Sequence, residues 1–149
     1  LRDAAPDAAP VWRLAAGELH RGDGSLWWLS GPWLANVAGS VDWPQPSTDL
    51  QLPGNGFLRL SGYAGQGLLQ VRYRQGGESL RIPNRGRRDL KRLLNEAGVP
   101  GFVRSRLPLL FVDGELVAVA NLPQFDAQAL SLQWSPPADA RFELIGSFE

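Results

Sequence analysis

A cluster of basic side chains between residues 72 and 106 has the composition needed to bind phosphate groups. This window holds ten basic residues and three acidic ones, a local charge of +7, whereas the fifteen basic and fifteen acidic residues of the whole chain cancel. Such a separation of charge predicts a surface that faces a polyanion. Nine of the ten are the predicted contacts: Arg72, Arg74, Arg85, Arg87, Arg88, Lys91, Arg92, Arg104 and Arg106.

The segment from Asn84 to Pro100 should position the densest part of this cluster. Apolar residues recur there with helical spacing and form one stripe: Leu90, Leu93, Leu94 and Ala97. Arg88, Lys91 and Arg92 repeat on the other side, and Gly98 is a helix stop signal. A helix start surrounded by arginines suits a phosphate. The alternative is a solvated helix face that binds nothing.

The remaining elements read mostly as strands. The clearest hairpin runs from Leu109 to Ala120 around an Asp113-Gly114 turn, and residues 130–134 alternate apolar and polar side chains. We therefore expect an α+β fold, mostly antiparallel sheet, with one principal amphipathic helix at about 87–97 and a short second helix at about 100–106. Residues 1–45 are predicted to extend a neighbouring central domain, and residues 46–149 to form the compact unit.

Residues suited to catalysis are scarce. The chain has no cysteine and a single histidine, His20, which we expect to lie on the surface of a hairpin beside Glu18 and Arg21. No spaced set of carboxylates or histidines predicts a metal site. No glycine-rich phosphate loop is found, so we expect the chain to perform no chemistry alone.

Four tryptophans could stack on unpaired bases. They are Trp27, Trp28, Trp33 and Trp43. Their strand-like and proline-rich surroundings favour packing in the core or between domains instead.

Two observations concern where the chain acts. No apolar run approaches the roughly 20 residues that span a bilayer, and no signal-peptide pattern opens the sequence. The sequence starts at Leu1 and contains no methionine, so we expect it to be a piece of a longer polypeptide that works in the cytoplasm.

Several motifs together resemble the C-terminal domain of tRNA(Ile)-lysidine synthetase. They are Leu90-Lys91-Arg92-Leu93-Leu94-Asn95-Glu96, Gly98-Val99-Pro100, Arg104, Pro108-Leu109-Leu110-Phe111 and Glu115-Leu116-Val117-Ala118. The chain departs from the family pattern at Arg92, Asn95, Gly101 and Phe102, where the family typically has lysine, glutamine, proline and tryptophan. These changes retain the charge pattern.

The resemblance implies a specific role. The family's full-length enzyme uses ATP, with Mg, to attach lysine to the wobble cytidine of the isoleucine tRNA with a CAU anticodon, which changes codon reading from AUG to AUA. Adenylation takes place in an N-terminal catalytic domain of the same polypeptide. This chain would therefore be the tRNA-binding portion, directed to the acceptor stem, with no cofactor, membrane or DNA partner of its own.

Two alternatives remain open. The basic face could instead bind an acidic protein or another domain of the same polypeptide. A self-sufficient enzyme would require a catalytic site that the sequence does not reveal.

Overall fold

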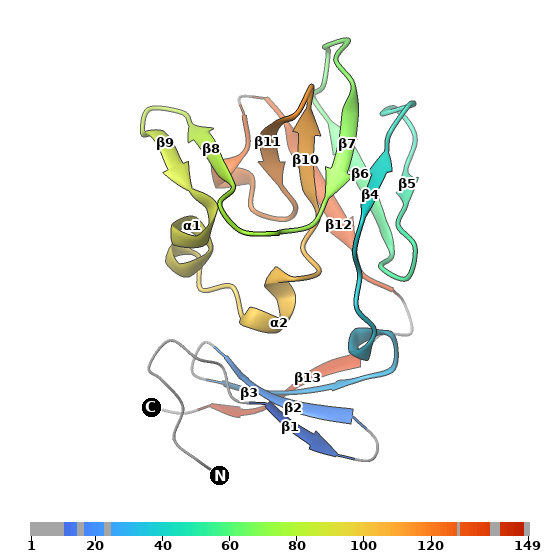
Figure 1. Cartoon of the computed structure of the whole chain (residues 1–149), viewed down its shortest axis with the longest axis vertical. Helices are drawn as coiled ribbons and strands as arrows, with labels where there is room; N and C mark the ends of the chain where they lie inside the picture. Colours follow the sequence, from blue (N-terminus) through green and yellow to red (C-terminus); the bar gives the residue numbers. More distant parts are fainter. Residues whose placement is uncertain (1–10, 15–16, 23–24, 128, 138–140, 148–149) are drawn as a thin grey trace.

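The fold is built almost entirely from antiparallel strands (Figure 1). A computed structural model describes residues 11–14, 17–22, 25–127, 129–137 and 141–147. Within these residues the α-helices are short, with seven residues in α1 (Leu90–Glu96) and four in α2 (Gly101–Arg104). The predicted α+β class is therefore wrong, and the described part of the chain is predominantly β.

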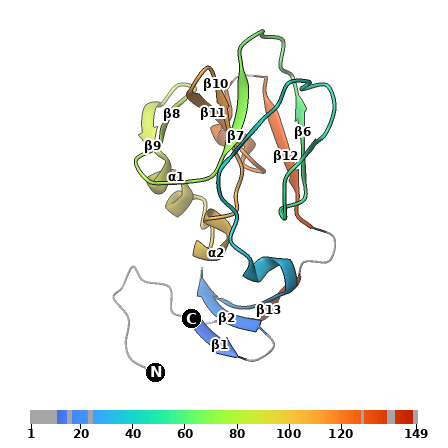
Figure 2. The same ribbon diagram turned by 45° about the vertical axis from the view of Figure 1, so that its right-hand side comes forward.

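An N-terminal sheet lies at one end of the molecule (Figures 1 and 2). Its strand order is β1 (Val11–Leu14), β2 (Gly17–Gly22), β3 (Ser25–Ser30) and β13 (Arg141–Ser147). The 3-10 turn η1 (Gly31–Leu34) then leads into the other sheets. Because β13 returns from the far end of the chain to pair with β3, this sheet joins both ends of the sequence. The predicted domain boundary near residue 45 stays a prediction.

Three further sheets form the other end of the molecule. The largest has the order β11 (Glu115–Val119), β10 (Leu109–Val112), β7 (Leu69–Arg72) and β4 (Ser40–Asp42). A second contains β12 (Ser131–Ser135), β6 (Phe57–Ser61) and β5 (Leu50–Gln51), and a two-stranded ribbon contains β8 (Ser79–Ile82) and β9 (Gly86–Asp89). The turn η2 (Pro123–Phe125) connects β11 towards β12.

The core lies between these sheets and follows from the sequence pattern. Leu109, Leu110 and Phe111 are all buried because β10 is a central strand covered on both faces. The predicted hairpin is confirmed, with β10 and β11 joined by Asp113 and Gly114, both at positive φ.

The principal helix is shorter than its apolar stripe predicted. Residues 87–89, expected to be helical, pair instead with β8, and Asp89 has an extended conformation at the helix N-cap. The predicted stop is confirmed: Gly98 has φ +68°, and Val99 N–H donates to the carbonyl of Leu94 at 3.1 Å. The second helix likewise covers 101–104 and not 100–106.

Candidate nucleic-acid interface

Helix α1 presents its basic residues to solvent. Leu90, Leu93 and Leu94 are buried in the core. This packing turns Lys91 and Arg92 outward, and both are exposed without an ion pair to a described carboxylate. Their position beside Asn95, three and four residues along the helix, places them on one helical face.

A second group of cations lies where strand β7 ends. Arg72 is paired with Leu109 at the end of the antiparallel register, and Arg74, two residues further on, lies near enough to Arg104 for its charge to act on that residue. Arg74 lies two residues beyond the end of β7 and, like Arg72, is partly buried. The guanidinium of Arg72 lies 4.5 Å from the ring centroid of Phe111, which fixes its direction.

Arg104 is held in place by the chain around it. Its Nε donates to the carbonyl oxygen of Val99 at 2.7 Å, and its Nη1 donates to Oδ1 of Asn95 at 2.6 Å. Burial lowers the pKa of Arg104 from its ordinary value, and the nearby positive charge of Arg74 lowers the pKa further. The bond to Asn95 also connects this group to the helix face that carries Lys91.

Arg85 is neutralised by an ion pair. Its two terminal nitrogens bind the two carboxylate oxygens of Glu96 at 3.0 and 3.1 Å. The hydrogen bond from Arg85 lowers the pKa of Glu96, and the charges of Arg85 and Arg88 act in the same direction. A phosphate at Arg85 would have to compete with this bidentate pair. Arg88, half-buried, remains beside it with its Nη1 bonded to the carbonyl oxygen of Arg87 at 3.0 Å.

Arg87 lies on the opposite side of β9 from Arg88. Neighbouring residues of a strand face opposite sides, so Arg87 and Arg88 leave β9 in opposite directions. Arg87 contacts Ser79 Oγ at 3.2 Å and Glu115 at 3.4 Å. Arg87 is therefore left out of the interface considered below, and its predicted contact with RNA stays a prediction.

Arg106 is the clearest correction to the predicted surface. Its side chain is buried, and the residue is 3% exposed. Nη2 donates to the carbonyl oxygens of Pro32 at 2.7 Å, Ala35 at 3.1 Å and Gly54 at 3.4 Å, while the guanidinium lies 5.1 Å from the ring centroid of Trp33. Backbone carbonyls thus take the place that phosphates were expected to fill.

The described residues therefore leave six of the nine predicted cations as a candidate interface. We call this set the cationic face: Arg72, Arg74, Arg88, Lys91, Arg92 and Arg104. Sequence reasoning missed Asn95, which orients Arg104. Nothing in the sequence around Asn95, which lies one helical turn after Lys91, indicates that its side chain binds Arg104.

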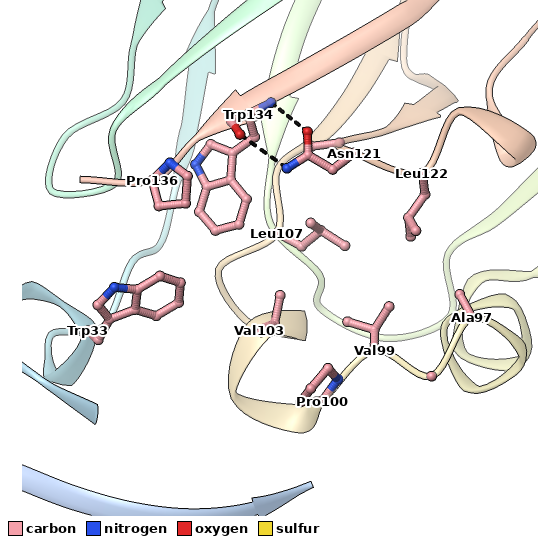
Figure 3. Close-up of a pocket in the computed structure, with 12 residues that line it drawn as sticks. Trp33, Ala97, Val99, Pro100, Val103, Leu107, Asn121, Leu122, Trp134 and Pro136 are labelled. Carbon is pink, nitrogen blue, oxygen red and sulfur yellow. Dashed lines mark hydrogen bonds between the residues drawn. The ribbon is translucent and has the colours of Figure 1, made fainter. Parts of the chain in front are cut away.

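An apolar cleft was also missed (Figure 3). It has a volume of about 350 Å³ and lies between η1 and the segment joining α1 to α2. Its lining residues are Trp33, Ala97, Gly98, Val99, Pro100, Val103, Leu107, Ala120, Asn121, Leu122, Trp134 and Pro136. The Asn121 side chain is already engaged, accepting from Trp134 N–H at 2.9 Å and donating to its carbonyl oxygen at 3.1 Å. With no charged side chain in its walls, the cleft does not suit a phosphate.

The aromatic residues mainly support packing. Trp33 and Trp43 are buried, as the packing interpretation predicted. His20 is not a free surface residue: its ring lies 5.4 Å from that of Phe102 on α2, and its Nε2 is 3.0 Å from Glu18. The ring centroids of Phe102 and Trp27 are 5.6 Å apart, so α2 packs on the N-terminal sheet.

The described residues offer neither a candidate metal site nor a candidate membrane-spanning helix. They contain no group of three or more histidines, cysteines or acidic residues that could hold a metal ion. Within the same residues, no helix has the length and apolar character required to cross a bilayer.

Fold and site define a small β-rich domain that carries a cationic face. A family model described as the TilS substrate C-terminal domain matches residues 69–134, which include every member of that face. The chain belongs to the tRNA(Ile)-lysidine synthase family, as its motifs predicted, and corresponds to the C-terminal part of these enzymes.

Similar proteins share most of this chain but are much longer. The tRNA(Ile)-lysidine synthase of Pseudomonas putida is 57% identical over 141 residues, 95% of this chain and 33% of that protein. The Pseudomonas aeruginosa enzyme is 56% identical, with 93% and 32% covered, and the Escherichia coli O157:H7 enzyme is 34% identical, with 77% and 28% covered. A crystal structure of a TilS C-terminal domain aligns with 64% of this chain and 98% of its own length, at 22% identity and a TM-score of 0.47. The chain thus spans about a third of the curated relatives it matches.

Proposed function

We propose that this chain is the tRNA-binding portion of a tRNA(Ile)-lysidine synthase. The observation that carries the proposal is the cationic face, which lies in a chain 57% identical to such an enzyme. Its members are contributed by β7, the residues directly after β7, β9, α1 and α2, and all lie within the family match.

The whole enzyme would attach lysine to the wobble cytidine of the isoleucine tRNA with a CAU anticodon, changing codon reading from AUG to AUA. ATP, with Mg, and lysine would be bound by an N-terminal catalytic domain of the same polypeptide. The chain described here would bind neither and would turn over nothing alone. It would act in the cytoplasm, with neither DNA nor membrane as a partner.

The cationic face would read an RNA duplex by its shape. The bases of A-form RNA lie in a deep, narrow major groove, so side chains mostly contact phosphates and 2′-hydroxyls. The acceptor stem is the duplex that we assign to this face. Contacts there would orient the tRNA, so that binding energy contributes to the correct presentation of a cytidine held elsewhere.

The decisive experiment is a fluorescence titration of the 149-residue chain with the isoleucine tRNA that carries a CAU anticodon. We expect saturable binding whose affinity falls steeply with salt, because each neutralised phosphate releases condensed counterions. Binding should persist in an acceptor-stem minihelix and disappear in an anticodon-arm hairpin of equal length. If neither RNA binds, or if the hairpins bind equally, the assignment to the acceptor stem fails.

A further inference from the structure

The cationic face contains a pair of partly buried arginines, Arg74 and Arg104, that no described carboxylate balances. Arg74 follows β7, and Arg104 ends α2. The register between β7 and β10 brings the two segments together, since Arg72 lies opposite Leu109. A separate contact agrees: the hydroxyl of Tyr73 and the carbonyl oxygen of Arg106 both accept from Nδ2 of Asn55, at 3.3 and 2.9 Å.

Neither arginine has an acidic partner among the described residues. Glu78, the acidic residue nearest to Arg74 in sequence, accepts from the backbone N–H groups of Gln75 at 2.7 Å and Gly76 at 3.0 Å. Both arginines are partly buried, so water screens the repulsion between their charges only in part. An anion placed between them would relieve this repulsion.

Arg104 is also preorganised for such an anion. Two of its donors, Nε and Nη1, are fixed on Val99 and Asn95, so the guanidinium plane has one direction before any ligand arrives. Nη2 makes no hydrogen bond to a described residue and remains available. Lys91 and Arg92 differ from it, because they are exposed side chains without such fixed partners.

We infer that Arg74 and Arg104 together bind a single phosphate of the RNA backbone, with Asn95 as the residue that positions Arg104. This inference rests on the proposed function and adds one specific subsite to it. The remaining cations of the face then supply general attraction, while this pair fixes one point of the duplex on the protein. A planar guanidinium donating from a fixed direction is well suited to a phosphate oxygen.

A double-mutant cycle tests the shared phosphate. The variants Arg74→Ala, Arg104→Ala and the double variant are titrated with the isoleucine tRNA over a range of salt concentrations. If one phosphate is shared, each single change should weaken binding about tenfold and the double change little more, far from the about hundredfold loss that independent contacts give. The salt slope, which is the slope of the logarithm of affinity against the logarithm of salt concentration, should become shallower by about one in all three variants, the amount expected for one lost phosphate contact. The matched control pair is Arg74→Ala with Arg92→Ala. Because these two residues are expected to contact different phosphates, the fold losses of tRNA affinity of the two single variants should multiply in the double variant.

Asn95→Ala provides a second readout, because it leaves every charge in place. We expect a threefold to tenfold loss of affinity, about the scale of one lost orienting hydrogen bond, with an unchanged salt slope. In the Arg104→Ala background the same change should have no further effect. Circular dichroism and thermal melting establish that each variant is folded.

The outcomes separate this inference from the proposed function. If the parent chain binds tRNA and the Arg74–Arg104 cycle is additive, with the salt slope falling by two in the double variant, the shared phosphate is excluded and the tRNA-binding role stands. If the parent chain does not bind tRNA, both proposals fail.

Discussion

Arg106 Nη2 donates a hydrogen bond to the carbonyl oxygen of Pro32 at 2.7 Å, across 74 positions of sequence. The contact connects η1, which leaves the N-terminal sheet, to the segment that follows α2. Because Trp33 lies against the same guanidinium and Phe102 packs on His20 and Trp27, α2 and the residues after it fix the N-terminal sheet to the rest of the molecule.

Arg106→Leu should therefore act on stability and not on the RNA-binding charge. The change leaves buried carbonyl oxygens without a donor, and we expect it to reduce the free energy of unfolding by about 3 kcal/mol. Urea denaturation measures this loss. The salt slope of tRNA binding by the folded variant should match the parent. A lower slope with unchanged stability would mean that Arg106 contacts the RNA after all.

Lys91→Ala combined with Arg92→Ala should weaken tRNA binding without unfolding the chain. Both side chains are exposed, while the leucines on the opposite side of α1 hold the helix in the core. Removing two phosphate contacts should lower the salt slope by about two. The control is Arg87→Ala, which also removes an arginine close to α1, but one that faces Glu115. Equal effects of the control and the double variant would contradict the cationic face as defined here.

Local signals were sufficient for the elements that the sequence predicted correctly. The β10–β11 hairpin follows from alternating apolar residues around Asp113-Gly114, and the end of α1 follows from Gly98. The start of α1 was misjudged because Arg88 continues the helical spacing of Lys91 and Arg92. Strand pairing with β8 overrides that spacing, as the partnership of Arg88 with Leu80 demonstrates.

The features that the sequence did not predict depend on contacts between residues far apart in the chain. The pairing of β13 with β3 joins segments more than a hundred residues apart, and neither strand marks the other as its partner. Arg106 was expected on the surface because the sequence predicted a short helix at about 100–106 that exposes Arg104 and Arg106. Its partners are backbone carbonyls, which leave no trace in the residue types of Pro32, Ala35 or Gly54.

Gly98→Ala should destabilise the chain by about 1 kcal/mol. Gly98 has φ +68°, which a residue with a Cβ adopts at a cost. The same turn positions the Val99 carbonyl that accepts from Arg104, so tRNA affinity should fall as well. Thermal melting and tRNA titration measure the two effects. Ala97→Gly, one residue earlier in the αR region, is the comparison, because a loss of helix propensity there leaves the positive-φ position intact.

Asp126 should give stability an unusual dependence on pH. It is 4% exposed, and burial raises the pKa of its carboxyl to about 6, although the backbone N–H groups of Val119 and Leu132 act in the opposite direction. A carboxyl whose pKa is higher in the folded state binds a proton more tightly there than in the unfolded chain. Its contribution to the free energy of unfolding is thus greatest below pH 4 and decreases as pH rises towards 6, by about 3 kcal/mol at most.

Asp126→Asn isolates this effect, since the amide oxygen can still accept from Val119 N–H while the charge is removed. Urea denaturation of the parent and the variant from pH 4 to 8 is the measurement. The stability of the variant relative to the parent should increase between pH 4 and 6 and stay constant above pH 7. Asp49→Asn is the comparison: the hydrogen bond from Arg59 lowers the pKa of Asp49, so its carboxylate is charged in the folded and unfolded chains throughout this range, and the relative stability of Asp49→Asn should not change from pH 4 to 8. A relative stability of Asp126→Asn that does not change with pH would show that Asp126 titrates alike in the folded and unfolded chains.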